Sequence, residues 1–189
     1  MLTLGVCAAF GLHVLLLDND KTIFEYNNST ELKSDNLIQT IDEALKQNGL
    51  DISDVDVLAT NIGPGSFTGI RVAISLVKGM AIETNKKLIT FNSFDCFGAG
   101  NVVLSGFGKF VYTRVNGKMA CENVSDVKVV DAVTDAKALS DEFGYKQASF
   151  NMKNIVLEKL KNNEFCQIEE LMPLYLRASQ AEIDREKNK

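Results

Sequence analysis

A glycine-rich turn followed by a helix is the part of this sequence that could do chemistry. Residues 63–71 read GPGSFTGIR, and a turn of this kind at a helix start is where many α/β proteins hold a phosphate against free backbone N–H groups. A P-loop requires a lysine and a hydroxyl residue after its second glycine. Here Gly69 is followed by Ile70 and Arg71. The P-loop pattern is therefore absent.

Two further motifs fail at the same turn. The dinucleotide-binding pattern needs a third glycine where this chain has Thr68. A nucleophile elbow needs glycines on both sides of its serine, and Pro64 and Thr68 stand at those positions around Ser66. We therefore expect the glycines to shape a turn and Ser66 to cap the following helix, in preference to direct phosphate binding.

Residues that could bind a metal are few and scattered. No C-x-x-C pair occurs, which argues against a zinc ribbon or redox motif, and the four cysteines are Cys7, Cys96, Cys121 and Cys166. Cys7 and His13, the only histidine, could meet on neighbouring strands as ligands. A histidine among apolar residues more often has a structural role, with its ring nitrogens hydrogen-bonded inside the protein. We expect reduced thiols and no metal bound by this chain.

Charge and hydropathy limit the classes of partner. The chain has 189 residues, a net charge of −5 and a pI near 5.0, so phosphate backbones repel it and any role on nucleic acid must pass through a partner. Residues 1–17 are apolar, but the first basic residue, Lys21, follows that run, whereas a signal peptide has its charge first. The run is also shorter than the roughly 20 residues that span a bilayer. We expect a cytoplasmic protein without membrane contact.

The first half of the chain alternates strand and helix patterns. The order βββαβαβ predicts an α/β layer fold, with strands at 2–8, 12–18, 22–26, 55–62 and 87–92 and helices at 34–48 and 68–83. This order resembles the half-domains of the actin-like, sugar-kinase and Hsp70 superfamily, which share a ribonuclease H-like fold. Ser34 is the expected cap of the first helix and Gly49 its stop.

The second half gives weaker signals. Strands are expected at 101–105 and 110–115, the second ending in the hairpin signal Asn116-Gly117, and a helix at 152–160. We expect two small lobes, residues 1–95 and a reduced α/β lobe at 96–189, because a glycine-containing break lies near residues 93–100.

The helix at 68–83 is apolar almost all round. Only a narrow polar stripe of Arg71, Ser75 and Lys78 interrupts it, which indicates burial on more than one side. Gly69 and Ala73 would leave a flat strip where another helix could approach. The second partner could be the helix at 34–48 or another chain, and composition alone leaves both open.

Residues 61–81, NIGPGSFTGIRVAISLVKGMA, resemble the signature of the TsaB (YeaZ) family. Two weaker resemblances lie at residues 173–177, PLYLR, and residues 108–112, GKFVY. The resemblance implies an actin-like fold in two lobes without catalysis of its own. It implies a non-catalytic subunit that dimerises with a TsaD-like paralogue through the two helices of the first lobe.

In that family the TsaD-like partner carries the metal and transfers the threonylcarbamoyl group to adenosine 37 of tRNA, giving N6-threonylcarbamoyladenosine, and a TsaE-like ATPase joins the assembly. ATP and the metal would belong to the complex, and tRNA would be reached only through it. No cofactor is expected on this chain. The signature and interface residues implied are Leu37, Ile41, Leu45, Gly63, Gly65, Ser66, Phe67, Thr68, Gly69, Arg71, Ala73, Leu76 and Met80.

Two departures from the family pattern bear on activity. Cys7 stands where relatives have the aspartate of a metal- and phosphate-facing loop, so no carboxylate remains there for hydrated magnesium. Lys33-Ser34 replaces the usual His-Ser, and a single histidine cannot form the H-x-x-x-H metal pair of TsaD-type relatives. Two alternatives stay open: a nucleotide-binding actin-like enzyme, and a homodimeric module that uses the same helix for itself.

Overall fold

The computed structural model describes residues 1–28, 36–82 and 84–177. The described residues form two compact units: unit 1 lies within Met1–Cys96 and Asn151–Pro173, and unit 2 comprises Phe97–Phe150 and residues 174–177. The lobe boundary expected near residue 95 would place residues 151–173 in the second lobe. In the structure this segment packs within unit 1. Sequence spacing predicted a helix there but gave no information on which sheet it would cover.

Unit 1 is built on one five-stranded sheet of order β3-β2-β1-β4-β5. The strands are β1 (Leu2–Cys7), β2 (Leu12–Asp18), β3 (Lys21–Asn28), β4 (Val57–Asn61) and β5 (Lys87–Phe91). The first three form an antiparallel meander, and β4 and β5 continue from β1 in parallel. Every residue of β1 and β4 is buried, which requires cover on both faces of the sheet.

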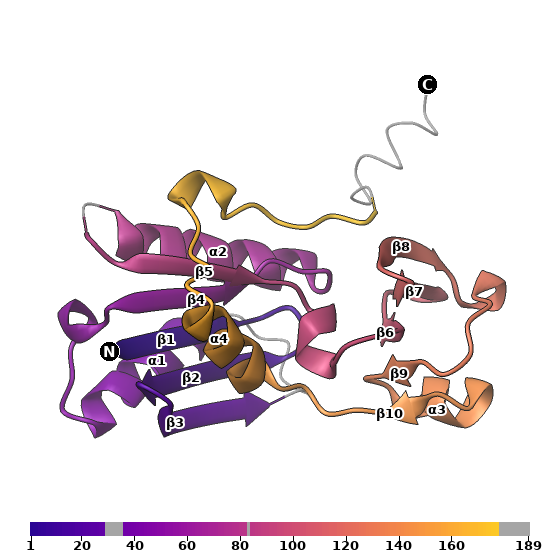
Figure 1. Ribbon diagram of the computed structural model, residues 1–189, viewed down its shortest axis with the longest axis horizontal. Helices are drawn as coiled ribbons and strands as arrows, with labels where there is room; N and C mark the ends of the chain where they lie inside the picture. Colours follow the sequence, from indigo (N-terminus) through magenta and orange to yellow (C-terminus); the bar gives the residue numbers. More distant parts are fainter. Residues whose placement is uncertain (29–35, 83, 178–189) are drawn as a thin grey trace. The chain divides into compact units, whose positions relative to one another are not determined.

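Three helices provide that cover. α1 (Leu37–Gln47) packs on β2 and β3, α2 (Phe67–Ala81) on β4 and β1, and α4 (Met152–Lys161) on β5. In Figure 1, α4 crosses one face of the sheet, while α1 and α2 lie on the other. A Cβ atom added to Gly5 would lie 3.4 Å from Met152 Sδ, so α4 rests closely on the centre of the sheet.

The helix ends follow local backbone chemistry. The expected cap Ser34 lies outside the described residues, and α1 is preceded by Asn36 without a side-chain cap bond. Its expected stop is confirmed, since Gly49 has φ +65°. The expected end of α2 at Glu83 also lies outside the described residues; the helix ends at Ala81, because Ile82 turns extended with ψ 133°.

Unit 2 holds a second five-stranded sheet of order β10-β9-β6-β7-β8. Its elements are β6 (Val102–Ser105), β7 (Phe110–Val115), β8 (Lys118–Asn123), β9 (Val133–Thr134), β10 (Lys146–Gln147) and α3 (Lys137–Phe143). Its core contains Val103, Val111, Ala132, Leu139 and Tyr145. The two predicted strands and the Asn116-Gly117 hairpin are confirmed, with φ +50° and +78° at the turn.

Short 3-10 helices complete the chain: η2 (Ile52–Asp54), η3 (Phe94–Phe97), η4 (Val124–Asp126) and η5 (Ile168–Glu170). Across the described ranges, none of the helices combines the length and the apolar character needed to cross a membrane.

Candidate functional site

The glycine-rich turn is held by buried polar groups at the ends of β4 and β5. Asn61 Oδ1 accepts a hydrogen bond from Gly63 N at 2.7 Å. Ser93 N donates to Gly63 O at 2.8 Å, and the Ser93 hydroxyl lies 2.5 Å from Pro64 O and 3.1 Å from Asn61 Oδ1. Asn61 and Ser93 are fully buried. The sequence motifs do not single out either residue, although a polar residue at the end of a buried strand, or just beyond it, is a signal for both.

The glycines face the backbone that follows β1. Ser66 N donates to Ala9 O at 2.8 Å. A Cβ atom on Gly65, whose φ is +150°, would lie 2.6 Å from Ala9 O, and one on Gly69 would lie 1.8 Å from Ala8 O. Glycine is therefore required for a close approach of two backbone segments. The space in front of these glycines holds carbonyl oxygens, which repel an anion.

Ser66 is the N-cap of α2. Its Oγ accepts from Gly69 N at 3.2 Å, and its carbonyl accepts from Ile70 N at 2.9 Å. The predicted cap is confirmed, and the geometry agrees with the interpretation of this segment as turn and cap.

Cys7 and His13 do meet, as directly opposed residues of β1 and β2. The His13 ring Nε2 lies 2.6 Å from Phe10 O, and burial lowers the pKa of His13, so the imidazole is neutral at physiological pH. Burial raises the pKa of the Cys7 thiol to about 11 and that of Cys96 well above its usual value. Within the described ranges no three His, Cys, Asp or Glu side chains gather as metal ligands.

Part of the expected interface is buried inside the monomer. Leu37, Ile41 and Leu45 form the inner face of α1, and Gly69 and Ala73 lie on the inner face of α2. Gly69 therefore does not lie open to a partner helix, because it faces the chain's own Ala8 carbonyl. The apolar spacing identified residues that pack against another surface. In the monomer, that surface belongs to the chain itself.

The remaining signature residues of α2 reach the surface. Thr68 and Arg71 are exposed, and Phe67 is 37% exposed with the Arg71 guanidinium 3.8 Å from its ring centre. Leu76 and Met80 are half-buried and share one side of the helix with Val72. We call Val72, Leu76 and Met80 the α2 flank. α2 thus has a buried apolar face and a second, half-exposed apolar side.

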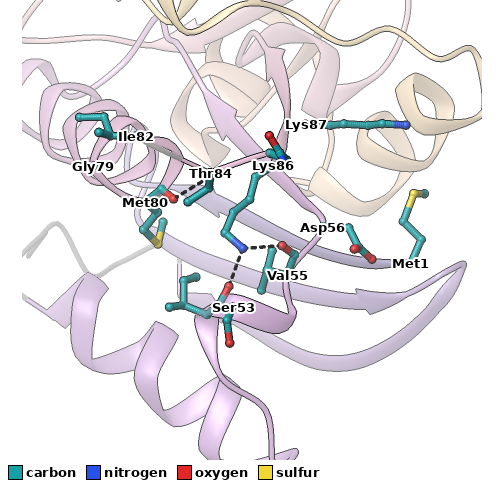
Figure 2. A pocket seen from close by; sticks show the side chains of 12 residues that line it. Met1, Ser53, Val55, Asp56, Gly79, Met80, Ile82, Thr84, Lys86 and Lys87 are labelled. Atoms are coloured by element: carbon teal, nitrogen blue, oxygen red, sulfur yellow. Dashed lines mark hydrogen bonds between the residues drawn. The ribbon is translucent and has the colours of Figure 1, made fainter.

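The α2 flank runs into a hollow at the end of the helix (Figure 2). Figure 2 shows Met80 in its wall, and the other lining residues are Met1, Ile52, Ser53, Val55, Asp56, Gly79, Ile82, Thr84, Asn85, Lys86 and Lys87. Lys86 Nζ donates to Ile52 O at 2.7 Å and to Val55 O at 2.6 Å, and Lys87 Nζ lies 4.6 Å from the Phe165 ring centre. Both ammonium groups are engaged within the chain, and the lining mixes apolar side chains with polar ones.

The two weaker family resemblances meet in unit 2. The Arg177 guanidinium lies 4.1 Å from the ring centre of Phe110, which joins residues 173–177 to the start of β7 through a cation–π contact. This contact therefore joins two segments that lie far apart in the sequence.

Comparisons with known proteins agree with this geometry. A protein-family profile described as "TsaD: tRNA N6-adenosine threonylcarbamoyltransferase" matches residues 28–103. The TsaB protein of Haemophilus influenzae is 36% identical over 98 residues, which cover 47% of this chain and 41% of that protein. The TsaB protein of Buchnera aphidicola is 33% identical over 64 residues, 32% of this chain and 29% of that protein.

A tRNA N6-adenosine threonylcarbamoyltransferase of Kosmotoga olearia is 40% identical over 58 residues, 31% of this chain and 18% of that protein. The alignments thus span less than half the length of these curated relatives.

Solved structures extend the likeness to the whole fold. YeaZ from Pseudomonas aeruginosa superposes with a TM-score of 0.75 at 19% identity, covering 93% of this chain and 99% of that one. A second structure, titled as an uncharacterised protein with similarity to peptidase YEAZ from Pseudomonas aeruginosa, gives 0.71 with 93% and 98% coverage. The fold is the actin-like, ribonuclease H-like α/β fold in two units, and the sequence is similar to TsaB proteins over part of their length.

Proposed function

We propose that this chain is a non-catalytic scaffold subunit that binds a TsaD-like paralogue and so supports threonylcarbamoyl transfer to adenosine 37 of tRNA. The observation that carries the proposal is the second apolar side of α2, which the monomer leaves half exposed. Such a surface is typical of a protein interface. The curated relatives are named for tRNA threonylcarbamoyladenosine biosynthesis.

The absence of catalysis by this chain is supported by what occupies the glycine turn. The Ala8 and Ala9 carbonyls stand against Gly69 and Gly65, and Cys7, with its raised pKa, offers a neutral thiol in place of a carboxylate. In this proposal ATP, the metal and the transfer reaction belong to the TsaD-like and TsaE-like partners. With a net charge of −5, the chain meets tRNA only through that cytoplasmic complex.

The interface we propose differs from the residue set implied by family resemblance. It comprises the α2 flank, Phe67 near the start of the helix, and the hollow that Met80 shares. Ile38, 64% exposed on α1, and Ile82, 58% exposed after α2, add apolar surface. Leu37, Ile41, Leu45, Gly69 and Ala73 act indirectly, because they fix both helices on the sheet.

The proposal is tested by depleting the protein in its cell and measuring threonylcarbamoyladenosine in tRNA by mass spectrometry. The modification is expected to fall and to recover with the wild-type chain and with Ser75→Glu, an exposed polar position on α2. It is expected not to recover with Leu76→Glu, which places a charge on the α2 flank. An unchanged level of the modification after depletion would refute the proposal.

A second test separates the scaffold from a nucleotide-binding enzyme. Titration of the isolated chain with ATP and magnesium in a calorimeter is expected to give no binding heat. A saturable heat that disappears in Ser66→Ala would show that the α2 N-terminus holds phosphate, and would overturn the non-catalytic part of the proposal.

A further inference from the structure

Two Asn-Gly pairs occur in the chain, Asn48-Gly49 and Asn116-Gly117. In such a pair the backbone nitrogen of the glycine can attack the side-chain carbonyl carbon of the asparagine. A bond forms between that nitrogen and Cγ, the Cγ–Nδ2 bond breaks, and ammonia leaves. Water then opens the succinimide ring to aspartate or isoaspartate, with no oxidant or reductant involved. Glycine favours the attack because it carries no side chain to block it.

At the first pair, both reacting groups are tied into the end of α1. Asn48 Nδ2 donates to Ala44 O at 2.8 Å, which holds the leaving amide. Gly49 N donates to Lys46 O at 3.1 Å, which holds the nucleophile. Both bonds must open before the nitrogen can reach Cγ, so the helix end protects this pair.

At the second pair, neither reacting group is tied. Asn116 and Gly117 are exposed at the tip of the β7–β8 hairpin, with φ +50° and +78°. Asn116 N donates to Asn101 Oδ1 at 3.1 Å, but this atom takes no part in the reaction. Within residues 84–177, the Asn116 side chain and Gly117 N make no hydrogen bond.

We propose that Asn116 is a site of spontaneous deamidation that the fold leaves reactive while it protects Asn48. The inference does not depend on the proposed function. Isoaspartate inserts an extra methylene into the backbone of a two-residue turn whose geometry sets the β7–β8 register. Among the described strands, β8 lies at the edge of its sheet and pairs with β7 alone, so this modification loosens β8.

The test compares the folded full-length chain with the same chain unfolded in urea, both aged in mildly alkaline buffer. Tandem mass spectrometry locates each amide-to-acid conversion, and methylation by protein isoaspartate methyltransferase detects isoaspartate. In urea the two asparagines are expected to react at similar rates. In the folded chain Asn116 is expected to keep that rate, while Asn48 slows roughly tenfold, since two hydrogen bonds must open.

Equal protection of Asn116 and Asn48 in the folded chain, or faster reaction of Asn48, would overturn the proposal. Hydrogen exchange tests its structural consequence. The aged chain is expected to exchange faster at Lys118–Asn123 than both fresh wild type and Asn116→Asp, which gains the charge without lengthening the backbone and suits the same turn. Unchanged exchange in aged chains that contain isoaspartate would refute the claimed effect on β8.

Discussion

Two glycines of α2 occupy opposite environments, and the contrast gives a matched pair of substitutions. A Cβ atom on Gly69 would lie 1.8 Å from Ala8 O, whereas one on Gly79 would contact nothing within 4 Å. Gly69→Ala is expected to destabilise the fold by roughly 1–3 kcal/mol, because the helix must move off the backbone beside it. Gly79→Ala is expected to stabilise it by roughly 0.5–1 kcal/mol through helix propensity.

Urea unfolding of both variants measures these changes. Equal stability of Gly69→Ala and wild type would mean that α2 does not pack on the Ala8 carbonyl as described.

The burial of Cys7 predicts how the free energy of unfolding changes with pH. Its folded pKa of about 11 lies above the value of 9.0 for a free thiol, so the unfolded chain ionises first as pH rises. The neutral buried thiol therefore stabilises the fold fully below pH 9, and this contribution is lost between about pH 9 and 11. Two pKa units correspond to roughly 2–3 kcal/mol.

Urea unfolding at a series of pH values checks this, with Cys7→Ala as the comparison. Cys96 adds a loss of the same sign, because burial and then the neighbouring Cys7 raise its pKa too. The difference between wild type and variant therefore measures Cys7 together with its effect on Cys96. The free energy of unfolding of Cys7→Ala is expected to fall less steeply above pH 9. Parallel curves for the two proteins would contradict a buried neutral Cys7.

The site was only partly predictable from single residues. Ser66 as a cap followed from its place before an apolar run, and the missing phosphate motifs followed from spacing. Asn61 and Ser93 could not be paired in advance, because their contact joins the ends of two parallel strands. The role of Gly69 depends on a carbonyl in a distant loop, which helix periodicity cannot reveal.

At the element scale, the packing of α4 on the sheet predicts how substitutions at Met152 change the stability of the fold. Met152 is buried against the centre of the unit 1 sheet beside Gly5. Met152→Ala is expected to cost roughly 2–5 kcal/mol through lost contact and a cavity, whereas Met152→Leu, with similar volume, is expected to cost less than about 1.5 kcal/mol. Urea unfolding measures both, and a negligible cost for Met152→Ala would contradict the packing of α4 on the sheet.

Elements were predictable where one pattern dominates. The buried strands of unit 1 and both of its first helices followed from apolar runs and helical spacing, and β6 and β7 from β-forming residues before Asn116-Gly117. β9 and β10 have only two residues each, too few for a periodic signal. On α1 and α2 the apolar spacing identified the buried faces, but not whether the sheet or another chain covers them.

At the scale of the whole molecule, unit 1 is discontinuous in sequence, since Asn151–Pro173 completes it. A fragment of residues 1–96 would expose the sheet face that α4 covers and the edge of β5, where Cys166 N donates to Leu88 O at 2.9 Å. The fragment is expected to bind a hydrophobic dye and to unfold without a cooperative transition. A cooperative transition as steep as that of the full chain would contradict this account of unit 1.

Direct binding between this chain and the TsaD-like protein of the same cell tests the central claim most closely. Sedimentation of the two purified proteins, mixed in equal amounts, should show a heterodimer for wild type and Ser75→Glu. The complex should be lost in Leu76→Glu, whose circular dichroism and unfolding should remain those of the wild type. No complex with the wild-type chain, or a complex that tolerates Leu76→Glu, would contradict a scaffold that works through the α2 flank.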